Sequence, residues 1–200
     1  MTNNHHRLLY LFTASLCLLS LVIQAMVFNI HTVIPGKLYR SGQLPVNALL
    51  TLVKRQKIRT LINLRGKNSG RKWYRDERAL AKTLGLKYLD VALNATHPPD
   101  SKQLQQLTTW ILHAKKPILA HCQGGVDRTG FASALAIALL THATLNQANT
   151  AFSIRYGFTH SRSIGPRLLK NYEQWLQQRL IAHSPSALQR WLAQYQPGRL

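Results

Sequence analysis

Residues 117–130 read PILAHCQGGVDRTG, and the fold class can be inferred from this segment. The short apolar run PILAH is typical of a buried strand. Residues 129–141 are almost entirely apolar and predict a buried helix. Between the two lies a glycine-rich loop that carries Cys122 and Arg128. A strand, a tight loop and a buried helix in this order are typical of an α/β protein.

The loop combines several features that bind an anion. Free backbone N–H groups and the helix dipole converge where the predicted helix begins, and both stabilise a thiolate or a phosphoryl group. Gly124 and Gly125 allow the backbone amides to approach a ligand closely. The planar guanidinium of Arg128 can donate to two phosphoryl oxygens at once. The residues therefore predict a phosphate site that faces the sulfur of Cys122.

Apolar and amphipathic stretches on either side extend the α/β interpretation. Strands are predicted at residues 37–40, 60–64, 87–93 and 117–121. Helices are predicted at residues 46–56, 71–84, 101–114 and 129–141, with further helices between about 145 and 195 that break near 157–161, 165–166 and 184–185. Residues 31–36 are interpreted as a connector. Trp175, Leu176 and Leu180 share a helical face and are expected to pack in the core.

The N-terminal residues 8–30 contain no charged side chain, and this length can span a bilayer as a helix. A cleaved secretory signal is the alternative, but the apolar part of such a signal is usually shorter. The sequence therefore predicts a membrane anchor over residues 1–30 and one further domain over residues 31–200. Few basic residues flank the apolar stretch on either side, so the side of the membrane on which the domain lies stays open.

The chain carries 26 lysines and arginines against six acidic residues, a formal net charge of +20. Such a balance indicates an anionic partner: a phosphorylated substrate, an anionic membrane surface or nucleic acid. A generally basic surface is the alternative. Nearly half of the basic residues lie between Lys54 and Lys87, but no nucleic-acid-binding motif accompanies them, so no nucleic-acid partner is expected. Cys17 lies in the apolar stretch, so no disulfide with Cys122 is expected.

The segment from Cys122 to Arg128 matches the Cys-x5-Arg signature of cysteine-dependent protein tyrosine phosphatases, and His121 and Thr129-Gly130 extend the match. Its Gly-x-Asp-Arg-Thr-Gly ending resembles the compact bacterial dual-specificity type. Residues 38–43 (LYRSGQ) and 60–65 (TLINLR) are similar to that group as well. Over residues 33–180 the resemblance implies a dual-specificity phosphatase-like fold: a central, mostly parallel sheet of about four or five strands flanked by helices. The predicted transmembrane helix precedes it.

The resemblance also implies a two-step mechanism without a metal or a cofactor. The Cys122 thiolate would attack phosphorus and form a phosphocysteine, which water then hydrolyses. Backbone amides and the Arg128 side chain would hold the phosphoryl oxygens. Thr129 would donate to the sulfur, and His121 would orient the loop. The implied substrate-binding residues are Gln123, Gly124, Gly125, Val126, Thr129 and Gly130.

The general acid must come from the six acidic residues of the chain. Three of them lie on helical patterns far from the loop in sequence and are set aside: Asp76, Glu77 and Glu173. Asp127 is ranked first, because a bound phosphate dianion would favour its protonated form and so suit it to donate a proton. Asp100 is ranked second, although it is also a good helix N-cap. Asp90, inside a predicted strand, is third.

These observations predict a membrane-anchored phosphatase of phosphotyrosine, phosphoserine and phosphothreonine proteins. A phospholipid phosphatase acting on phosphatidylglycerophosphate or a phosphoinositide is the alternative; the loop interior lacks the basic residues common in lipid-specific relatives. A rhodanese-type sulfurtransferase and a non-catalytic protein that binds phosphate or nucleic acid through its charge alone are further alternatives. Arg40, Arg65 and Lys67 follow predicted strand ends and are candidate substrate contacts. With the bacterial type of the resemblance, residues 8–30 would make a single pass through the inner membrane.

Overall fold

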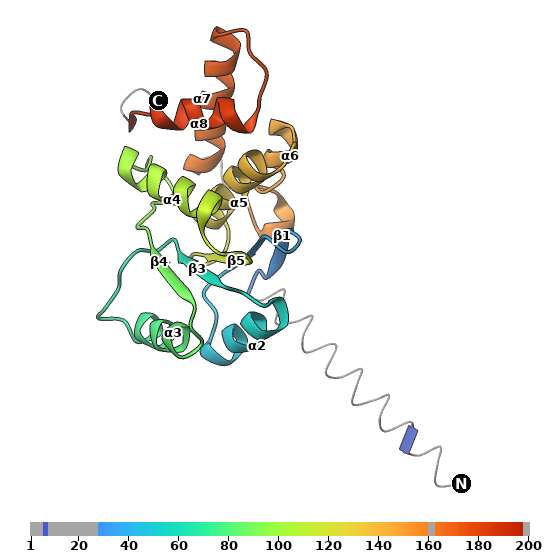
Figure 1. Cartoon of the computed structure of the whole chain (residues 1–200), viewed down its shortest axis with the longest axis vertical. Coiled ribbons are helices and arrows are strands. Elements are labelled where there is room, and N and C mark those ends of the chain that lie inside the picture. The colour runs from blue at the N-terminus through green and yellow to red at the C-terminus, as the bar shows by residue number, and fades with distance from the viewer. Residues whose placement is uncertain (1–5, 8–27, 160–162, 198–200) are drawn as a thin grey trace.

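The computed structural model describes residues 6–7, 28–159 and 163–197 of the 200-residue chain (Figure 1). The predicted membrane anchor lies outside the described residues, apart from His6 and Arg7 near its start and Phe28, Asn29 and Ile30 at its end, and so does Cys17. Among the helices of the described part, none is long and apolar enough to cross a membrane.

Five short strands form one sheet in the order β1-β2-β5-β3-β4. Their bounds are β1 His31–Ile34, β2 Leu38–Ser41, β3 Thr60–Asn63, β4 Lys87–Asp90 and β5 Ile118–His121. The four strands β2, β5, β3 and β4 are parallel to one another, and among the five strands only β1 is antiparallel to its neighbour. The predicted α/β fold with a mostly parallel sheet is confirmed. The central strand β5 is buried along its whole length, as the apolar run in the sequence indicates.

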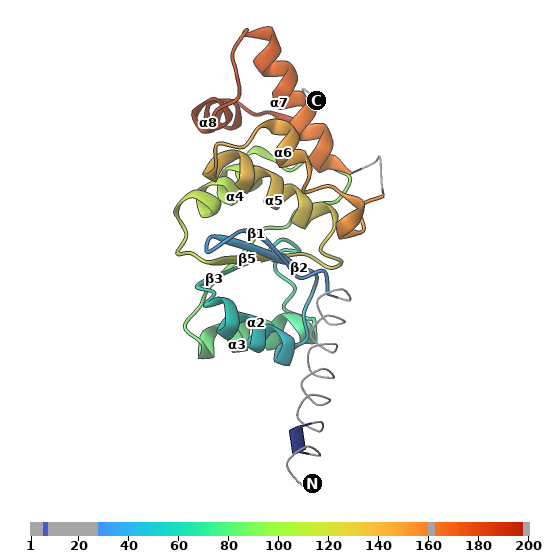
Figure 2. The same ribbon diagram turned by 90° about the vertical axis from the view of Figure 1, so that its right-hand side faces the viewer.

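Helices cover both faces of the sheet (Figure 2). One face carries α2 (Val46–Gln56) and α3 (Lys72–Thr83), and the other carries α4 (Ser101–His113) and α5 (Asp127–Leu140). A third layer covers α5 from outside and consists of α6 (Leu145–Asn149), α7 (Ile164–Gln178) and α8 (Pro185–Ala193). Because α5 lies between the sheet and this outer layer, it is buried on nearly every side. This position explains why its sequence is apolar without helical periodicity.

Two sequence predictions near the ends of the domain are wrong. The connector predicted at residues 31–36 is the strand β1, which returns to β2 through a turn with Gly36 at a φ of 68°. The break predicted at residues 165–166 is the first turn of α7. Pro166 fits there, because the N–H groups of the first turn have no partner within the helix and the missing donor costs nothing.

The predicted apolar stripe on α7 is only partly correct. Leu176 is buried and Trp175 packs against the core, but Leu180 is 95% exposed. The helix ends at Gln178, and Leu180 adopts a φ of 53°. The change in backbone direction removes Leu180 from the helical face that its spacing predicted.

The direction of β1 brings the start of the described domain to one particular edge of the sheet. His31, the first residue of β1, pairs with Arg40 near the end of β2. The carboxyl ends of β2, β3 and β5 lie at the same edge, because these strands are parallel and in register. Residues 28–30 therefore reach the domain at the edge where the loop after β5 begins. This is also the edge at which α/β folds bind ligands.

Candidate active site

The loop predicted to bind phosphate joins β5 to α5 at the carboxyl edge of the sheet. Cys122 follows directly on β5, and its side chain is 3% exposed. Arg128 lies in the first turn of α5 and is half-buried. No side chain caps the N-terminus of α5. Since the first N–H groups of a helix have no intrahelical partner, they remain available to an anion.

Gly125 is indispensable to the shape of this loop. Its φ is 71°, a conformation that glycine adopts without strain. A Cβ atom there would lie 2.7 Å from the backbone nitrogen of Gly42 and 2.8 Å from the carbonyl carbon of Ser41. Neither backbone atom can move without displacing the end of β2. Any other residue at position 125 would therefore force the loop away from the sheet.

Arg40 holds the loop by hydrogen bonds from the interior of the domain. Its side chain is fully buried, and Nη2 donates to the carbonyl oxygens of Gly125 at 2.7 Å and Val126 at 3.4 Å. Nη1 donates to the carbonyl of Ala151 at 2.9 Å, and the guanidinium lies 3.9 Å from the ring centroid of Tyr156. Burial lowers the pKa of Arg40 to about 10, so the group is still charged at neutral pH. The expectation that Arg40 contacts substrate is wrong, because no part of its side chain is exposed.

Asn29 binds the same loop from outside. Its side-chain amide lies 3.2 Å from the carbonyl oxygen of Gly124, 3.1 Å from that of Gly125 and 2.9 Å from that of Tyr156. The neighbouring carbonyl of Phe28 accepts a hydrogen bond from Gly42 at 2.7 Å. Asn29 has a φ of 53°, which asparagine tolerates better than most residues. With Arg40, it holds loop carbonyls away from the side on which an anion would bind.

His121 is held by a buried carboxylate, that of Glu77. Nε2 of His121 lies 2.9 Å from Oε1 of Glu77, and Nδ1 lies 3.3 Å from the carbonyl oxygen of Cys122. Both ring nitrogens face oxygen acceptors, so both contacts are hydrogen bonds only when each nitrogen carries a proton. Tyr88 and Gln43 also donate to Glu77, each at 2.6 Å.

The hydrogen bonds at Glu77 keep it ionised although it is only 3% exposed. Burial raises the pKa of this carboxyl, but the charge of His121 and the hydrogen bonds from His121, Tyr88 and Gln43 together hold it below its ordinary value. Glu77 is distant from the loop in sequence but not in space, because α3 folds over the sheet and brings this carboxylate to His121. The sequence contains one signal of this: Tyr74, Glu77 and Ala81 form the buried face of α3.

The remaining candidate acids differ in the hydrogen bonds that their carboxylates accept. Asp100 accepts from the backbone N–H of Gln103 at 2.7 Å in a complete capping box. Asp90 accepts from Asn63 at 2.9 Å and from the Tyr74 hydroxyl at 2.6 Å. Asp127 is the first residue of α5, half-buried within the loop. Of the three, Asp127 alone lies in the loop itself.

The other predicted residues surround the loop. Gln123 and Gly124 are exposed, Val126 is half-buried, and Thr129 and Gly130 are buried. The hydrogen bond that the Thr129 hydroxyl makes in the structure goes to the carbonyl of Ser41, at 3.5 Å, and its contact with the sulfur stays a prediction.

Of the two remaining candidate contacts, Lys67 is exposed and Arg65 is half-buried. Arg65 lies over the ring of Trp73 at 3.9 Å and donates to Gln43 at 3.0 Å. Burial, the nearby charge of Arg128 and that of Arg71 lower its pKa. Arg65 and Arg128 thus place two guanidinium groups beside the loop.

A cysteine at the end of a central parallel strand, a glycine loop and an arginine in the first turn of the next helix define the class of cysteine-dependent phosphatases. The chain belongs to the DSP-PTPase phosphatase family of polymorphic toxin systems (Tc-R-P), whose model matches residues 37–144. The resemblance seen in the sequence is confirmed, and the protein is a phosphoric monoester hydrolase of this type. No curated protein sequence matches the chain.

Solved phosphatase structures share the fold. The core catalytic domain of the PP-IP phosphatase Siw14 from S. cerevisiae has a TM-score of 0.58 at 23% identity, over 71% of this chain and 83% of that one. TpbA from P. aeruginosa, in complex with pTyr, has a TM-score of 0.51 at 22% identity, over 65% and 75%. Tk-PTP has a TM-score of 0.57 at 20% identity, over 74% and 96%.

Proposed function

We propose that the protein hydrolyses phosphate monoesters in two steps at the loop after β5. In the first step a sulfur–phosphorus bond to Cys122 forms, the ester P–O bond breaks, and the leaving oxygen takes a proton from Asp127. In the second, water attacks phosphorus, gives its proton to Asp127 and releases phosphate from the sulfur. The observation that carries the proposal is the placement of Cys122 directly after β5 and of Arg128 in the uncapped first turn of α5, at the two ends of one loop.

The proposed substrates are phosphotyrosine, phosphoserine and phosphothreonine in proteins. Two observations support them: the loop interior carries no lysine or arginine, and TpbA, which shares the fold, has been solved with pTyr bound. Phospholipid phosphomonoesters are the second candidate. They are favoured by Asn29, which links the end of the apolar stretch at residues 8–30 to the loop itself. The proposal includes the membrane anchor over that stretch.

A substrate panel on the purified full-length chain tests the function. Phosphotyrosine and phosphoserine peptides, phosphatidylglycerophosphate, phosphoinositides and p-nitrophenyl phosphate are each assayed for phosphate release with and without a metal chelator. We expect hydrolysis that the chelator does not affect, with the phosphopeptides turned over fastest. Hydrolysis that stops on chelation, or sulfur transfer from thiosulfate to cyanide without phosphate release, would contradict the proposal.

Replacing Asp127 by asparagine tests the general acid. We expect Asp127→Asn to lower kcat for a phosphopeptide by roughly 10²-fold or more, since asparagine cannot protonate the leaving oxygen. A substrate with a better leaving group, such as p-nitrophenyl phosphate, should lose less. The matched control is Asp100→Asn, which removes a helix-capping carboxylate and should affect unfolding more than turnover. A larger loss of kcat in Asp100→Asn than in Asp127→Asn would assign the acid to the loop before α4.

A further inference from the structure

The chain enters the described domain directly beside the phosphate loop. The side chain of Asn29 contacts the carbonyls of Gly124 and Gly125, and the carbonyl of Phe28 accepts from Gly42 at 2.7 Å. No linker residues separate the end of the uncharged stretch at residues 8–30 from these contacts. A partner that binds the uncharged stretch therefore also lies close to the active-site edge of the sheet.

An exposed apolar residue lies at the same place. The short 3-10 helix η1 (Ile154–Tyr156) presents Ile154, whose side chain is 82% exposed, and the exposed Arg155. η1 is fixed on the domain through Tyr156, whose carbonyl accepts from Asn29 at 2.9 Å. The ring of Tyr156 packs edge-on against His31 at 4.8 Å. An apolar side chain and a cationic one thus stand next to Tyr156, which contacts the chain where it enters the domain.

Further cationic side chains lie at the carboxyl edge of the sheet. Arg128 lies in the first turn of α5, and the half-buried Arg65 follows β3 and lies over the ring of Trp73 at 3.9 Å. The guanidinium of Arg155, outside the phosphate loop, lies 5.7 Å from the ring centroid of Tyr156. The buried carboxylate of Glu77 faces inward, toward His121 and Tyr88. This edge of the domain therefore offers cations to whatever it faces.

We propose that the active-site edge docks on an anionic lipid bilayer, with Ile154 and Arg155 in contact with the lipid surface. Proteins bind such surfaces by inserting apolar side chains at the boundary between head groups and acyl chains. Neighbouring cationic side chains then contact the anionic head groups. The uncharged stretch of sequence ends at this edge, which makes a bilayer the partner that the position favours. The inference rests on the membrane anchor of the proposed function.

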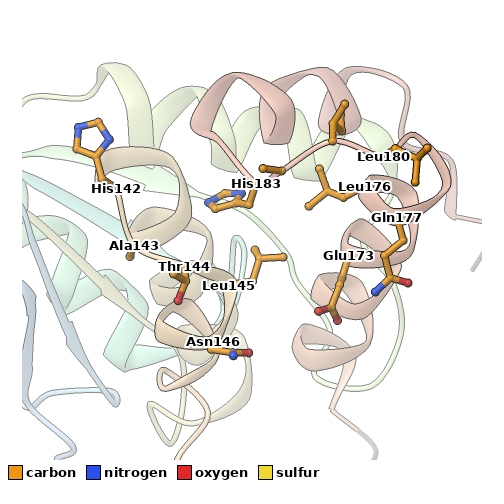
Figure 3. Close-up of a pocket in the computed structure, with 12 residues that line it drawn as sticks. His142, Ala143, Thr144, Leu145, Asn146, Glu173, Leu176, Gln177, Leu180 and His183 are labelled. Atoms are coloured by element: carbon orange, nitrogen blue, oxygen red, sulfur yellow. The ribbon is translucent and has the colours of Figure 1, made fainter.

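A second strongly exposed apolar residue of the described part, Leu180, provides a matched comparison. Leu180 lies beside Arg179 and lines an open groove of about 610 Å³ between α6 and α7 (Figure 3). The groove includes His142 and Ala143, which follow the C-terminal end of α5, whereas the phosphate loop lies at its N-terminal end. The Arg179–Leu180 pair is thus similar in chemistry to Ile154–Arg155 but is placed far from the point of chain entry.

The test uses the full-length chain in nanodiscs of phosphatidylcholine, with and without phosphatidylglycerol. Co-elution of the chain with the discs reports the anchor, and hydrogen exchange measured by mass spectrometry reports docking. We expect residues 153–158 to exchange several-fold more slowly in the anionic discs, whereas residues 179–184 do not change. The double variant Ile154→Asp/Arg155→Glu should lose this protection. The control Arg179→Glu/Leu180→Asp should keep it.

Hydrolysis of soluble p-nitrophenyl phosphate is measured on the same samples. We expect both double variants to retain it, because none of the four substituted side chains lies in the phosphate loop. A chain can co-elute with the discs and hydrolyse the soluble ester and still show the same exchange rate at residues 153–158 in both kinds of disc. That result would overturn the docking proposal but not the anchor or the proposed function. A chain that does not co-elute with the discs overturns the anchor and docking together. If the wild-type chain does not hydrolyse the ester, the proposed function is contradicted. The exchange measurement then still decides whether docking occurs.

Discussion

The Cys122→Ser variant is expected to lose hydrolysis of p-nitrophenyl phosphate by on the order of 10⁴-fold or more, because a serine hydroxyl without a general base is a poor nucleophile. Serine is close to cysteine in size, so the buried position should tolerate it and the chain should unfold at nearly the same temperature as the wild type. Initial rates and thermal unfolding monitored by circular dichroism measure the two effects.

Binding of inorganic phosphate separates a chemical loss from a structural one. Cys122→Ser keeps the amides and Arg128, so its affinity for phosphate should stay within a few-fold of the wild type. In Arg128→Ala, phosphate affinity and kcat should both fall, the latter by roughly 10²–10³-fold, since one charged clamp on the phosphoryl oxygens is gone. Undiminished turnover in Cys122→Ser would exclude the phosphocysteine mechanism.

Removing the Arg40 guanidinium should damage both the fold and the site. In Arg40→Met the buried carbonyl of Ala151 loses its donor, at about 1–3 kcal/mol for an unsatisfied group, whereas that of Gly125 keeps only the amide of Asn29. Relief of the buried charge offsets part of this loss. We therefore expect the free energy of unfolding to fall by about 1–3 kcal/mol, and kcat/KM to fall further than the stability change explains.

Urea unfolding and steady-state kinetics of the same samples measure these effects. Arg40→Lys keeps the charge but offers a single point donor in place of the planar fork. It should recover part of the stability and less of kcat/KM. The matched control is Arg55→Met, at an exposed arginine in the last turn of α2, which should change neither quantity. Equal effects of Arg40→Met and Arg55→Met would show that the loop does not depend on the buried guanidinium.

Local patterns in the sequence predict most of the fold. The apolar run before Cys122 and the apolar helix after Arg128 are local features, and the structure places a central strand and a buried helix there. β1 is missed because four residues, HTVI, carry too little pattern to distinguish a strand from a connector. Leu180 is placed wrongly because helical spacing does not show where the helix ends.

The support of the site is harder to read from the sequence, since it depends on contacts between distant segments. The contact between Glu77 and His121 joins residues that are 44 positions apart, and Asn29 reaches Gly125 over 96 positions. No local spacing encodes either contact. Only the buried face of α3 hints at the first, because a carboxylate at an apolar position needs a buried partner.

The antiparallel direction of β1 limits the distance from the proposed anchor at which the active site can meet a substrate. Since β1 returns the chain to the edge where the phosphate loop begins, Asn29, at the end of the uncharged stretch of sequence, contacts the loop directly. A tethered enzyme with a long linker searches a large volume at a low effective concentration. With the proposed anchor in a bilayer, this enzyme would search only a thin layer next to it. Its selectivity would then come from where a phosphate group is located as much as from what carries it.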